Sequence, residues 1–276
     1  MNYRFFSKNG EILAVEQAVI PLSSIEYQYG FGVYETVRVT NKVPYFLQEH
    51  LERFKESARI IGLEHPFSKP FIKNAVSELI EKNEVGTCNL KLLLIGGKIK
   101  EDASLYILCL NPLFPDKKLY KDGVHCITYS YERAFPHAKT LNMLESYLAY
   151  RKARKAGAYE ALFVNGEGDI TEGTRTNFFA LKGKTLYTPP EHDILLGVTR
   201  KAVLHIAQRN GFSVEEARLR PEETSEYDSA FLTSTSSKIL PVQSIDSHTL
   251  KIPPASLREL MSHFEEFLSS CGGALS

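Results

Sequence analysis

Three features that could act in one reaction occur in a fixed order along the chain: Lys139, then Glu172, then a glycine-led helix start at Gly197. A lysine amine can add to a carbonyl group and form a Schiff base. A carboxylate can hold a proton on the nitrogen of a pyridine ring, and the free N–H groups at the start of a helix can bind a phosphate. Each signal is weak alone, so the interpretation depends on their order and surroundings.

Pyridoxal 5'-phosphate requires all three of these functions, but each residue also has a simpler interpretation. Lys139 precedes an apolar segment, and most lysines in such a place keep their ammonium in water. Catalysis would require partial burial or a neighbouring cation that lowers the pKa of the amine. Glu172 could be the partner of a pyridine nitrogen or an exposed residue of a turn between strands. The local sequence leaves both questions open.

Several residues could bind the phosphate of such a cofactor. The segment from Gly197 onward is typical of a helix start with Thr199 as its N-cap, although capping needs no ligand. The hydroxyls of Ser234 and Thr235 lie in a loop rich in serine and threonine, which is a common composition. Arg53 is the cation expected to contact the phosphate, with a surface ion pair along its own helix as the alternative.

Composition and charge argue against several other classes. The chain has 276 residues, 43% hydrophobic and 24% charged, as in a globular protein of one large or two modest domains. Lysine plus arginine equals aspartate plus glutamate at 33 each, so no charge excess indicates nucleic acid or an anionic membrane as a partner. No stretch reaches membrane-spanning length, and the N-terminus lacks the apolar core of a signal peptide. We therefore expect a soluble, cytoplasmic protein.

Histidine and cysteine spacing indicates no metal site. The eight histidines form no ligand cluster, and the cysteines lack the paired spacing of a zinc site. We expect reduced thiols, as in a cytosolic protein, at Cys88, Cys109, Cys126 and Cys271.

The order of strand-like and helical segments predicts an α+β fold of two domains. Residues 33–39 alternate as a strand does, Asn41-Lys42 is expected to turn a hairpin, and 48–61 and 71–83 have helical periodicity. Further strands are expected at 90–95, 104–110, 124–129, 160–164, 177–181 and 230–233, and further helices at 141–156, 199–209 and 257–268. We expect a small N-terminal domain (1–112), a linker (113–121) and a larger C-terminal domain (122–276) that carries Lys139.

Six blocks of residues occur in the order found in one enzyme family. They are His50-Leu51-Glu52-Arg53, the Lys139 segment, Thr171-Glu172-Gly173 with Asn177, Tyr187-Thr188-Pro189-Pro190, Gly197-Val198-Thr199-Arg200, and Leu232-Thr233-Ser234-Thr235 with Pro241-Val242. Together with the segment 29–38 they make nearly the whole chain resemble the class IV (fold type IV) pyridoxal-phosphate enzymes. That family includes branched-chain aminotransferases, D-amino acid aminotransferases and aminodeoxychorismate lyases.

The resemblance assigns expected roles to individual residues. It implies that Lys139 is the Schiff-base lysine and proton shuttle and that Glu172 pairs with the pyridine nitrogen. The resemblance also implies that Tyr34 and Arg38 lie on the substrate side. It implies that the phosphate is bound by Arg53, the backbone of Val198 and Thr199, and Thr235, with Ser234 beside it. The family's fold has two α+β domains with the cofactor in the cleft between them, and it works as a homodimer.

The substrate side of the sequence departs from the relatives. Leu144 stands where branched-chain enzymes usually have a tyrosine, and the segment Leu94–Lys100 lacks both the arginine–histidine pair of the D-amino acid enzymes and the arginine–proline pair of the branched-chain enzymes. Arg38 is therefore the first candidate for the substrate carboxylate, because it shares a strand face with Tyr34. Lys98, Lys100 or a loop backbone are the alternatives.

The expected activity is therefore a pyridoxal-phosphate-dependent transfer of an amino group between an amino acid, either branched-chain L- or D-, and a 2-oxo acid. One alternative in the same family is an aminodeoxychorismate lyase that produces 4-aminobenzoate and pyruvate. A second, in a different class, is a cofactor-free binding protein on the same fold. The lysine and the glutamate do not separate the first two, since both reactions begin by removing a proton from the substrate Cα.

Overall fold

The computed structural model describes residues 3–250 and 253–270, which form two compact units. The first unit reaches Leu113 and also includes Ala138–Asn142, while the second contains Phe114–His137 and the chain from Met143 onward. The sequence placed Lys139 in a C-terminal domain, whereas its segment packs with the first unit. The residues before Tyr3 and after Ser270 lie outside the described part of the chain. They include Cys271, for which a reduced thiol was expected.

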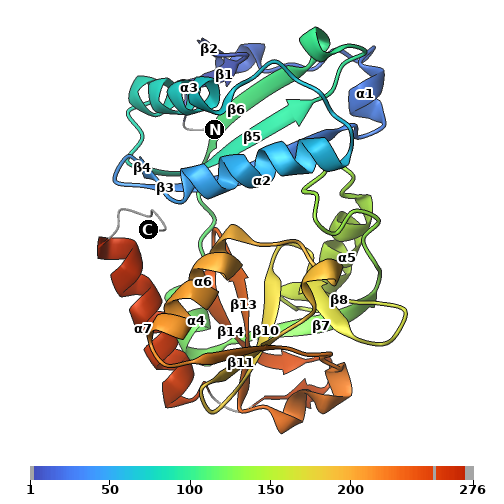
Figure 1. The fold of residues 1–276 in the computed structure, drawn as a ribbon, viewed down its shortest axis with the longest axis vertical. Coiled ribbons are helices and arrows are strands. Elements are labelled where there is room, and N and C mark those ends of the chain that lie inside the picture. The colour runs from blue at the N-terminus through green and yellow to red at the C-terminus, as the bar shows by residue number, and fades with distance from the viewer. Residues whose placement is uncertain (1–2, 251–252, 271–276) are drawn as a thin grey trace. The chain divides into compact units, whose positions relative to one another are not determined.

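A six-stranded sheet with helices on one face builds the first unit (Figure 1). Its strands are in the order β2-β1-β6-β5-β3-β4, and all of its pairings are antiparallel. The elements are β1 (Phe5–Lys8), β2 (Glu11–Ala14), α1 (Ile25–Gln28), β3 (Gly32–Thr40), β4 (Val43–Pro44), α2 (Leu47–Ile60), α3 (Lys69–Lys82), β5 (Thr87–Ile95) and β6 (Ser104–Leu110).

One face of strand β3 is apolar except for Glu35, much as its alternating sequence predicts. Val33, Val37 and Val39 are fully buried in the core that α2 and α3 cover. Tyr34 and Arg38 belong to the opposite face, because successive side chains of a strand alternate. The predicted turn at Asn41-Lys42 is confirmed: both residues have positive φ, +51° and +67°, as a tight hairpin requires.

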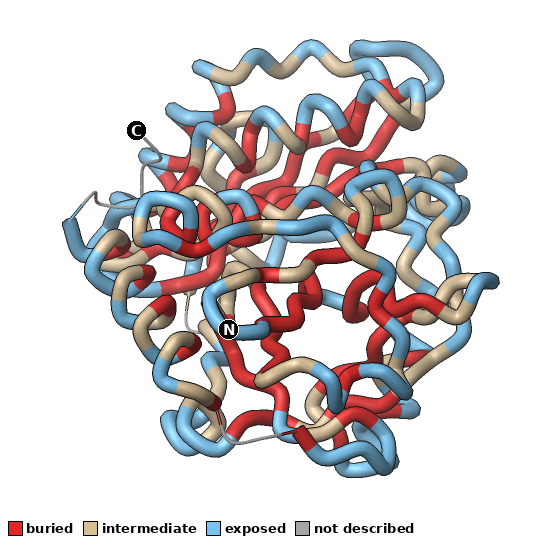
Figure 2. The backbone as a smooth tube through the Cα atoms, turned by 60° about the horizontal axis from the view of Figure 1, so that its bottom comes forward, coloured by how far each residue is buried: buried red, intermediate tan, exposed pale blue. Residues whose placement is uncertain are grey.

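In the second unit a nine-stranded sheet closes on itself. The path β10-β13-β14-β7-β8-β9 returns to β10 through the pairing of β9 with β10, and β11 and β12 extend it beyond β10. The strands are β7 (Val124–Ser130), β8 (Glu160–Val164), β9 (Ile170–Gly173), β10 (Asn177–Lys182), β11 (Thr185–Thr188), β12 (Ser213–Glu216), β13 (Ser229–Ser234), β14 (Lys238–Ile245) and β15 (His248–Thr249). Most residues of the ring strands are buried, in red in Figure 2.

Four helices accompany these strands: α4 (Lys117–Asp122), α5 (Leu144–Lys155), α6 (Val198–Arg209) and α7 (Ala255–Ser270). The expected helix from residue 141 begins only at Leu144, because the preceding residues bond to β3 instead. The Tyr34 N–H donates to the Lys139 carbonyl (2.9 Å), and the Leu141 N–H donates to the Gly32 carbonyl (2.8 Å). Tertiary hydrogen bonding has therefore overridden the local helical pattern.

Some sequence expectations did not cover the whole fold. The strands that the sequence did not predict are β1, β2, β9, β11, β12, β14 and β15. Of these, β14 contains Pro241, which cannot donate to a ladder and so weakens a strand signal. Cys88, Cys109 and Cys126 are free and buried. Within the described part of the chain, no helix is both long enough and apolar enough to cross a membrane.

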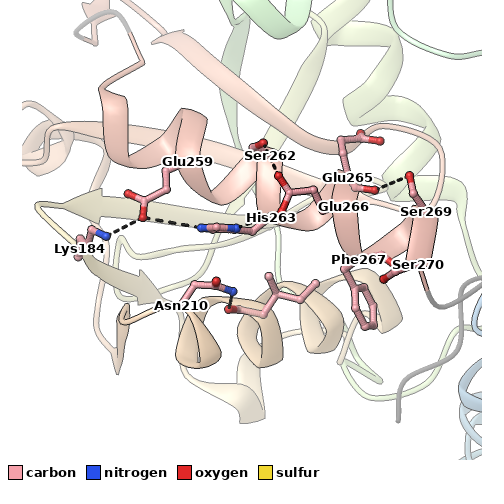
Figure 3. Close-up of polar contacts among 11 residues, drawn as sticks. Lys184, Asn210, Glu259, Ser262, His263, Glu265, Glu266, Phe267, Ser269 and Ser270 are labelled. Carbon is pink, nitrogen blue, oxygen red and sulfur yellow. Dashed lines mark hydrogen bonds and ion pairs between the residues drawn. The ribbon is translucent and has the colours of Figure 1, made fainter.

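The terminal helix α7 is held mainly by apolar packing. It buries Leu257, Leu260, Phe264 and Leu268 along one side and lies against α6. Polar contacts line its other side, where Lys184 Nζ is 2.7 Å and His263 Nε2 is 3.7 Å from Glu259 Oε1 (Figure 3). Lys184 is exposed and the other two groups are partly exposed, so their attraction is screened by water and contributes little.

We therefore expect Leu260→Ala to destabilise the protein by about 2–5 kcal/mol, as deletions of buried leucine side chains do. Lys184→Met removes the exposed ion pair and should leave the unfolding transition nearly unchanged. Urea unfolding followed by circular dichroism, with hydrogen exchange across α7, measures both. Equal destabilisation by the two variants would contradict this account, because the ion pair would then hold the helix as strongly as the packing does.

Candidate functional site

The amine of Lys139 lies beside an aromatic ring in the first unit. Lys139 is half-buried, and its Nζ is 4.5 Å from the centroid of the Tyr34 ring. Its backbone N–H donates to Ser57 Oγ at 3.0 Å, which ties the segment to α2. Lys91 Nζ approaches the same ring to 3.4 Å. Lys139 therefore lies partly buried against an aromatic ring that a second amine also contacts.

Arg53 is oriented by a buried carboxylate that the sequence analysis did not single out. Glu35, on β3, is fully buried, and its Oε1 and Oε2 accept from Arg53 Nε (2.7 Å) and Nη2 (2.9 Å). His50 Nδ1 lies 2.7 Å from Glu35 Oε2. These contacts fix the guanidinium plane, because a carboxylate and an arginine fork bond in one geometry.

The charges of this cluster follow from burial and from pairing. Burial alone would raise the pKa of Glu35, but the Arg53 guanidinium and His50 outweigh it and hold that pKa well below its usual range. Burial lowers the pKa of His50, although Glu35 opposes the shift. Glu35 is therefore ionised and His50 neutral near pH 7, so His50 donates its Nδ1–H to the carboxylate.

The other predicted substrate residue, Arg38, is on the same strand face as Tyr34. Tyr34 is 9% exposed, and Arg38 is half-buried with its Nε near Thr40 Oγ1 at 3.4 Å. Lys98 and Lys100, the alternatives for the substrate carboxylate, are both exposed. Of these cations, Arg38 is thus the one that lies beside Tyr34 on the sheet.

Glu172 is a buried strand residue, so its interpretation as an exposed turn residue is wrong. It lies on β9 with 2% exposure, and Arg133 Nε donates to its Oε1. Its Oε2 accepts the N–H of Leu195 at 3.2 Å. Arg133, which the sequence analysis missed, therefore fixes the orientation of the carboxylate from a loop 39 residues away.

Register places three polar residues side by side across three strands of the second unit. Glu172 pairs with Asn177 between β9 and β10, and Asn177 pairs with Thr233 between β10 and β13. Thr233 is 1% exposed, and its Oγ1 has no hydrogen-bond partner in the structure. A buried hydroxyl without a partner is costly, and a bound polar ligand would satisfy it.

The same row of residues fixes the start of helix α6. Asn177 Nδ2 donates to the Leu195 carbonyl at 2.7 Å, two residues before Gly197. A Cβ on Gly197 would lie 2.0 Å from Asn177 Oδ1, so only glycine allows this approach. Gly197 is the N-cap and makes no side-chain cap, so the assignment of Thr199 as N-cap is wrong. Val198 and Thr199 form the first turn, where N–H groups have no partner within a helix.

Ser234 and Thr235 lie where β13 turns into β14. Ser234 Oγ is 2.6 Å from Ser237 Oγ and accepts the Ser237 N–H at 3.0 Å. The turn closes on Lys238 with φ +57°, and Thr235 is half-buried. The Ser234 hydroxyl thus stabilises the turn, and its neighbour Thr235 occupies the turn itself.

A second buried acid, Glu160, supports the strand that carries Glu172. Glu160 is on β8 with 0% exposure, and its Oε1 accepts from Thr174 Oγ1 at 2.5 Å and from the Ala161 N–H at 3.1 Å. Burial raises the pKa of this carboxyl, while Arg175 opposes the rise. Glu160 therefore holds the turn that joins β9 to β10, and a charged residue at the start of an apolar strand was its only sequence signal.

The structure thus brings the predicted residues together in two sets. In the first unit Lys139, Tyr34 and Arg53 are linked through β3 and α2. In the second unit Glu172 and the first turn of α6 are linked through Asn177 and Leu195. The charged residues of these two sets that the sequence did not indicate are Glu35, Lys91, Arg133 and Glu160.

Comparisons with known proteins agree on one family. The Amino-transferase class IV family matches residues 32–245. A D-alanine aminotransferase of Bacillus licheniformis is 33% identical over 252 residues, with 88% of each chain covered. A putative branched-chain-amino-acid aminotransferase of Methanocaldococcus jannaschii is 30% identical over 254 residues, again with 88% of each covered.

Solved structures give the same result. The branched-chain aminotransferase of Thermoproteus uzoniensis with norvaline has a TM-score of 0.88 and 28% identity, and the match covers 98% of this chain and 97% of that one. A further branched-chain amino acid aminotransferase, solved with pyridoxamine 5'-phosphate, has a TM-score of 0.88 and 27% identity, with 95% and 93% covered. The expected fold class is therefore confirmed, and this chain belongs to the class IV aminotransferases.

Proposed function

We propose that this aminotransferase uses pyridoxal 5'-phosphate to move an amino group between a D- or branched-chain L-amino acid and a 2-oxo acid. The observation that carries the proposal is the link between Glu172 and helix α6. The buried carboxylate accepts the N–H of Leu195, two residues before the Gly197 N-cap. An acid for a ring nitrogen and a helix start for a phosphate are thereby built into one piece of structure.

The residues present fit the chemistry of that cofactor. The unpartnered Thr233 hydroxyl next to Asn177 indicates that the row of polar residues has unused bonding capacity. We assign the ring nitrogen to Glu172, with Arg133 holding that carboxylate in place. We assign the phosphate to Arg53, to the first-turn N–H groups of Val198 and Thr199, and to the hydroxyls of Ser234 and Thr235.

Lys139 would hold the cofactor aldehyde through its Nζ and then carry a proton to and from the substrate Cα. When bound, the cofactor supplies an electron-accepting ring next to the bond that breaks. We assign the substrate side to Tyr34 and Arg38. Arg38 is supported by its position beside Tyr34 on β3 and by the exposure of Lys98 and Lys100.

We also infer that the protein acts as a homodimer in the cytoplasm, with small amino acids and 2-oxo acids as its partners. Support for a reducing compartment comes from Cys88, Cys109 and Cys126, which are free and buried in the described chain. Sedimentation equilibrium in the analytical ultracentrifuge tests the dimer, because the molar mass measured for a dimer would be twice the 31.2 kDa of the chain.

The role of Lys139 can be tested by trapping. Borohydride reduction of the purified yellow protein should fix the cofactor to Lys139, since reduction makes a Schiff-base link permanent. Peptide mapping by mass spectrometry locates the label. Lys139→Ala should keep the phosphate site and bind cofactor without a covalent link, but should lose transamination. Lys98→Ala, which removes an exposed lysine, is the matched control and should behave as wild type.

A label on another lysine, or turnover retained in Lys139→Ala, would remove Lys139 from the reaction. A panel of donors run in parallel, with both enantiomers of alanine and leucine, defines the substrate series. Aminodeoxychorismate is tested beside them, because conversion of that compound alone would favour the lyase activity.

The role of Glu172 can be tested by removing its charge. Glu172→Gln should reduce kcat roughly a hundredfold or more, because a buried electrostatic contact to the reacting ring is commonly worth a few kcal/mol. Glu167→Gln is the matched control, since Glu167 is exposed in the turn before β9 and pairs there with Arg218. Steady-state rates and circular dichroism are measured for both. Near wild-type kcat in Glu172→Gln would exclude it from the chemistry.

A further inference from the structure

Two lysine amines contact one aromatic ring in the first unit. Lys91 Nζ is 3.4 Å and Lys139 Nζ is 4.5 Å from the centroid of the Tyr34 ring. Both distances are measured to the centroid of the same ring. The two amines therefore lie within about one Debye length of each other, which is roughly 8–10 Å in physiological salt. In a partly buried setting such charges interact strongly, because little water screens them.

The sheet explains how Lys91 reaches this position. Lys91 lies in β5, a central strand, between Leu90 and Leu92, which are both fully buried in the core under the helices. Alternation therefore directs Lys91 to the other face of the sheet. Its register partner there is Thr36, two residues from Tyr34 on β3. Lys91 is consequently half-buried beside the Tyr34 ring.

The electrostatic coupling of the two lysines is visible in Lys91. Burial, assisted by the charge of Lys139 and opposed by Tyr34 and Glu35, lowers the pKa of Lys91 to about 8. The repulsion between two charges is mutual, so protonated Lys91 disfavours protonation of Lys139 to the same extent. At pH 7 Lys91 is still mostly protonated, because the pH is about one unit below its pKa.

We propose that Lys91 is a positioning residue for Lys139, whose ammonium, held against the Tyr34 ring, keeps the Lys139 amine in the unprotonated form that can attack an aldehyde. The inference deepens the proposed function and rests on the role assigned there to Lys139. A protonated amine has no lone pair to give, so a lysine that must bond to a carbonyl benefits from a neighbouring cation.

The first unit contains other charged and ionisable groups besides the two lysines. Glu35 is engaged by Arg53 and by the neutral His50, so its charge is already balanced on the other face of β3. The guanidinium groups of Arg38 and Arg53 keep their charge over the whole working pH range, so they add no pH dependence of their own. The groups on the surrounding elements are Tyr34, Glu35 and Arg38 on β3, His50 and Arg53 on α2, Tyr106 on β6 and Lys8 on β1.

The test compares the reactivity of Lys139 in three variants of the full-length protein freed of cofactor. Competitive labelling with acetic anhydride, followed by peptide mapping, reports the fraction of unprotonated Lys139 at each pH. Lys91→Met removes the neighbouring charge, and Lys91→Arg keeps it. Lys8→Met is the matched control, because Lys8 also lies over a tyrosine ring of the same sheet, 5.6 Å from the centroid of Tyr106.

At pH 7 we expect Lys139 to be labelled about five- to tenfold more slowly in Lys91→Met than in wild type, as loss of one nearby charge implies. Lys91→Arg and Lys8→Met should label like wild type. Above about pH 9 wild type should approach Lys91→Met, because Lys91 itself has lost its proton, while Lys91→Arg should not. Circular dichroism checks that each variant is folded.

Equal labelling of Lys139 in wild type and Lys91→Met would overturn the proposal, and so would a Lys91→Arg variant that behaves like Lys91→Met. A raised KM for amino acids with unchanged labelling would also overturn it, since Lys91 would then act on the substrate. If Lys139 does not carry the cofactor at all, borohydride trapping in wild type fails, which separates an error in the proposed function from an error here.

Discussion

The pairing of β9 with β10 is the constraint on which the second unit depends. It closes the ring of strands and sets Glu172 directly opposite Asn177. Asn177 in turn fixes Leu195 and leaves room only for glycine at position 197, so one register determines both the acid and the start of helix α6. A slip of one residue would turn every side chain of β9 to the other face and separate them.

The buried ion pairs of this protein are better explained by the way they orient side chains than by a contribution to folding stability. Two ion pairs each remove a carboxylate from water, Glu35 with Arg53 and Glu172 with Arg133. The cost of that desolvation offsets much of the attraction between the opposite charges. What the pairs provide is a fixed direction for a guanidinium or a carboxylate on a rigid strand or helix. The apolar cores, such as the one beneath α2 and α3, supply the stability that these pairs do not.

Periodicity made most of the framework predictable, but the environment of single charged residues was not. The alternation of residues 33–39 and the helical spacing of 48–61 match β3 and α2 closely, because one face of each is buried. Lys91 could not be recognised as a neighbour of Tyr34 and Lys139, because the sequence around a lysine in an apolar strand does not show which side chains face it. The extended Lys139 segment was also missed, because its hydrogen bonds go to residues more than eighty positions away. The order of Lys139, Glu172 and Gly197, together with the other matching blocks, nevertheless indicated the family.

A half-reaction tests the central claim most directly. The protein is mixed with a reactive amino acid in the absence of any 2-oxo acid, and the products are quantified. The account predicts one equivalent of 2-oxo acid per subunit and then no more, because the amino group remains on the enzyme until an acceptor is added. A different 2-oxo acid should then release one equivalent of its amino acid. Continuous product formation without an acceptor, or none in either step, would contradict the account.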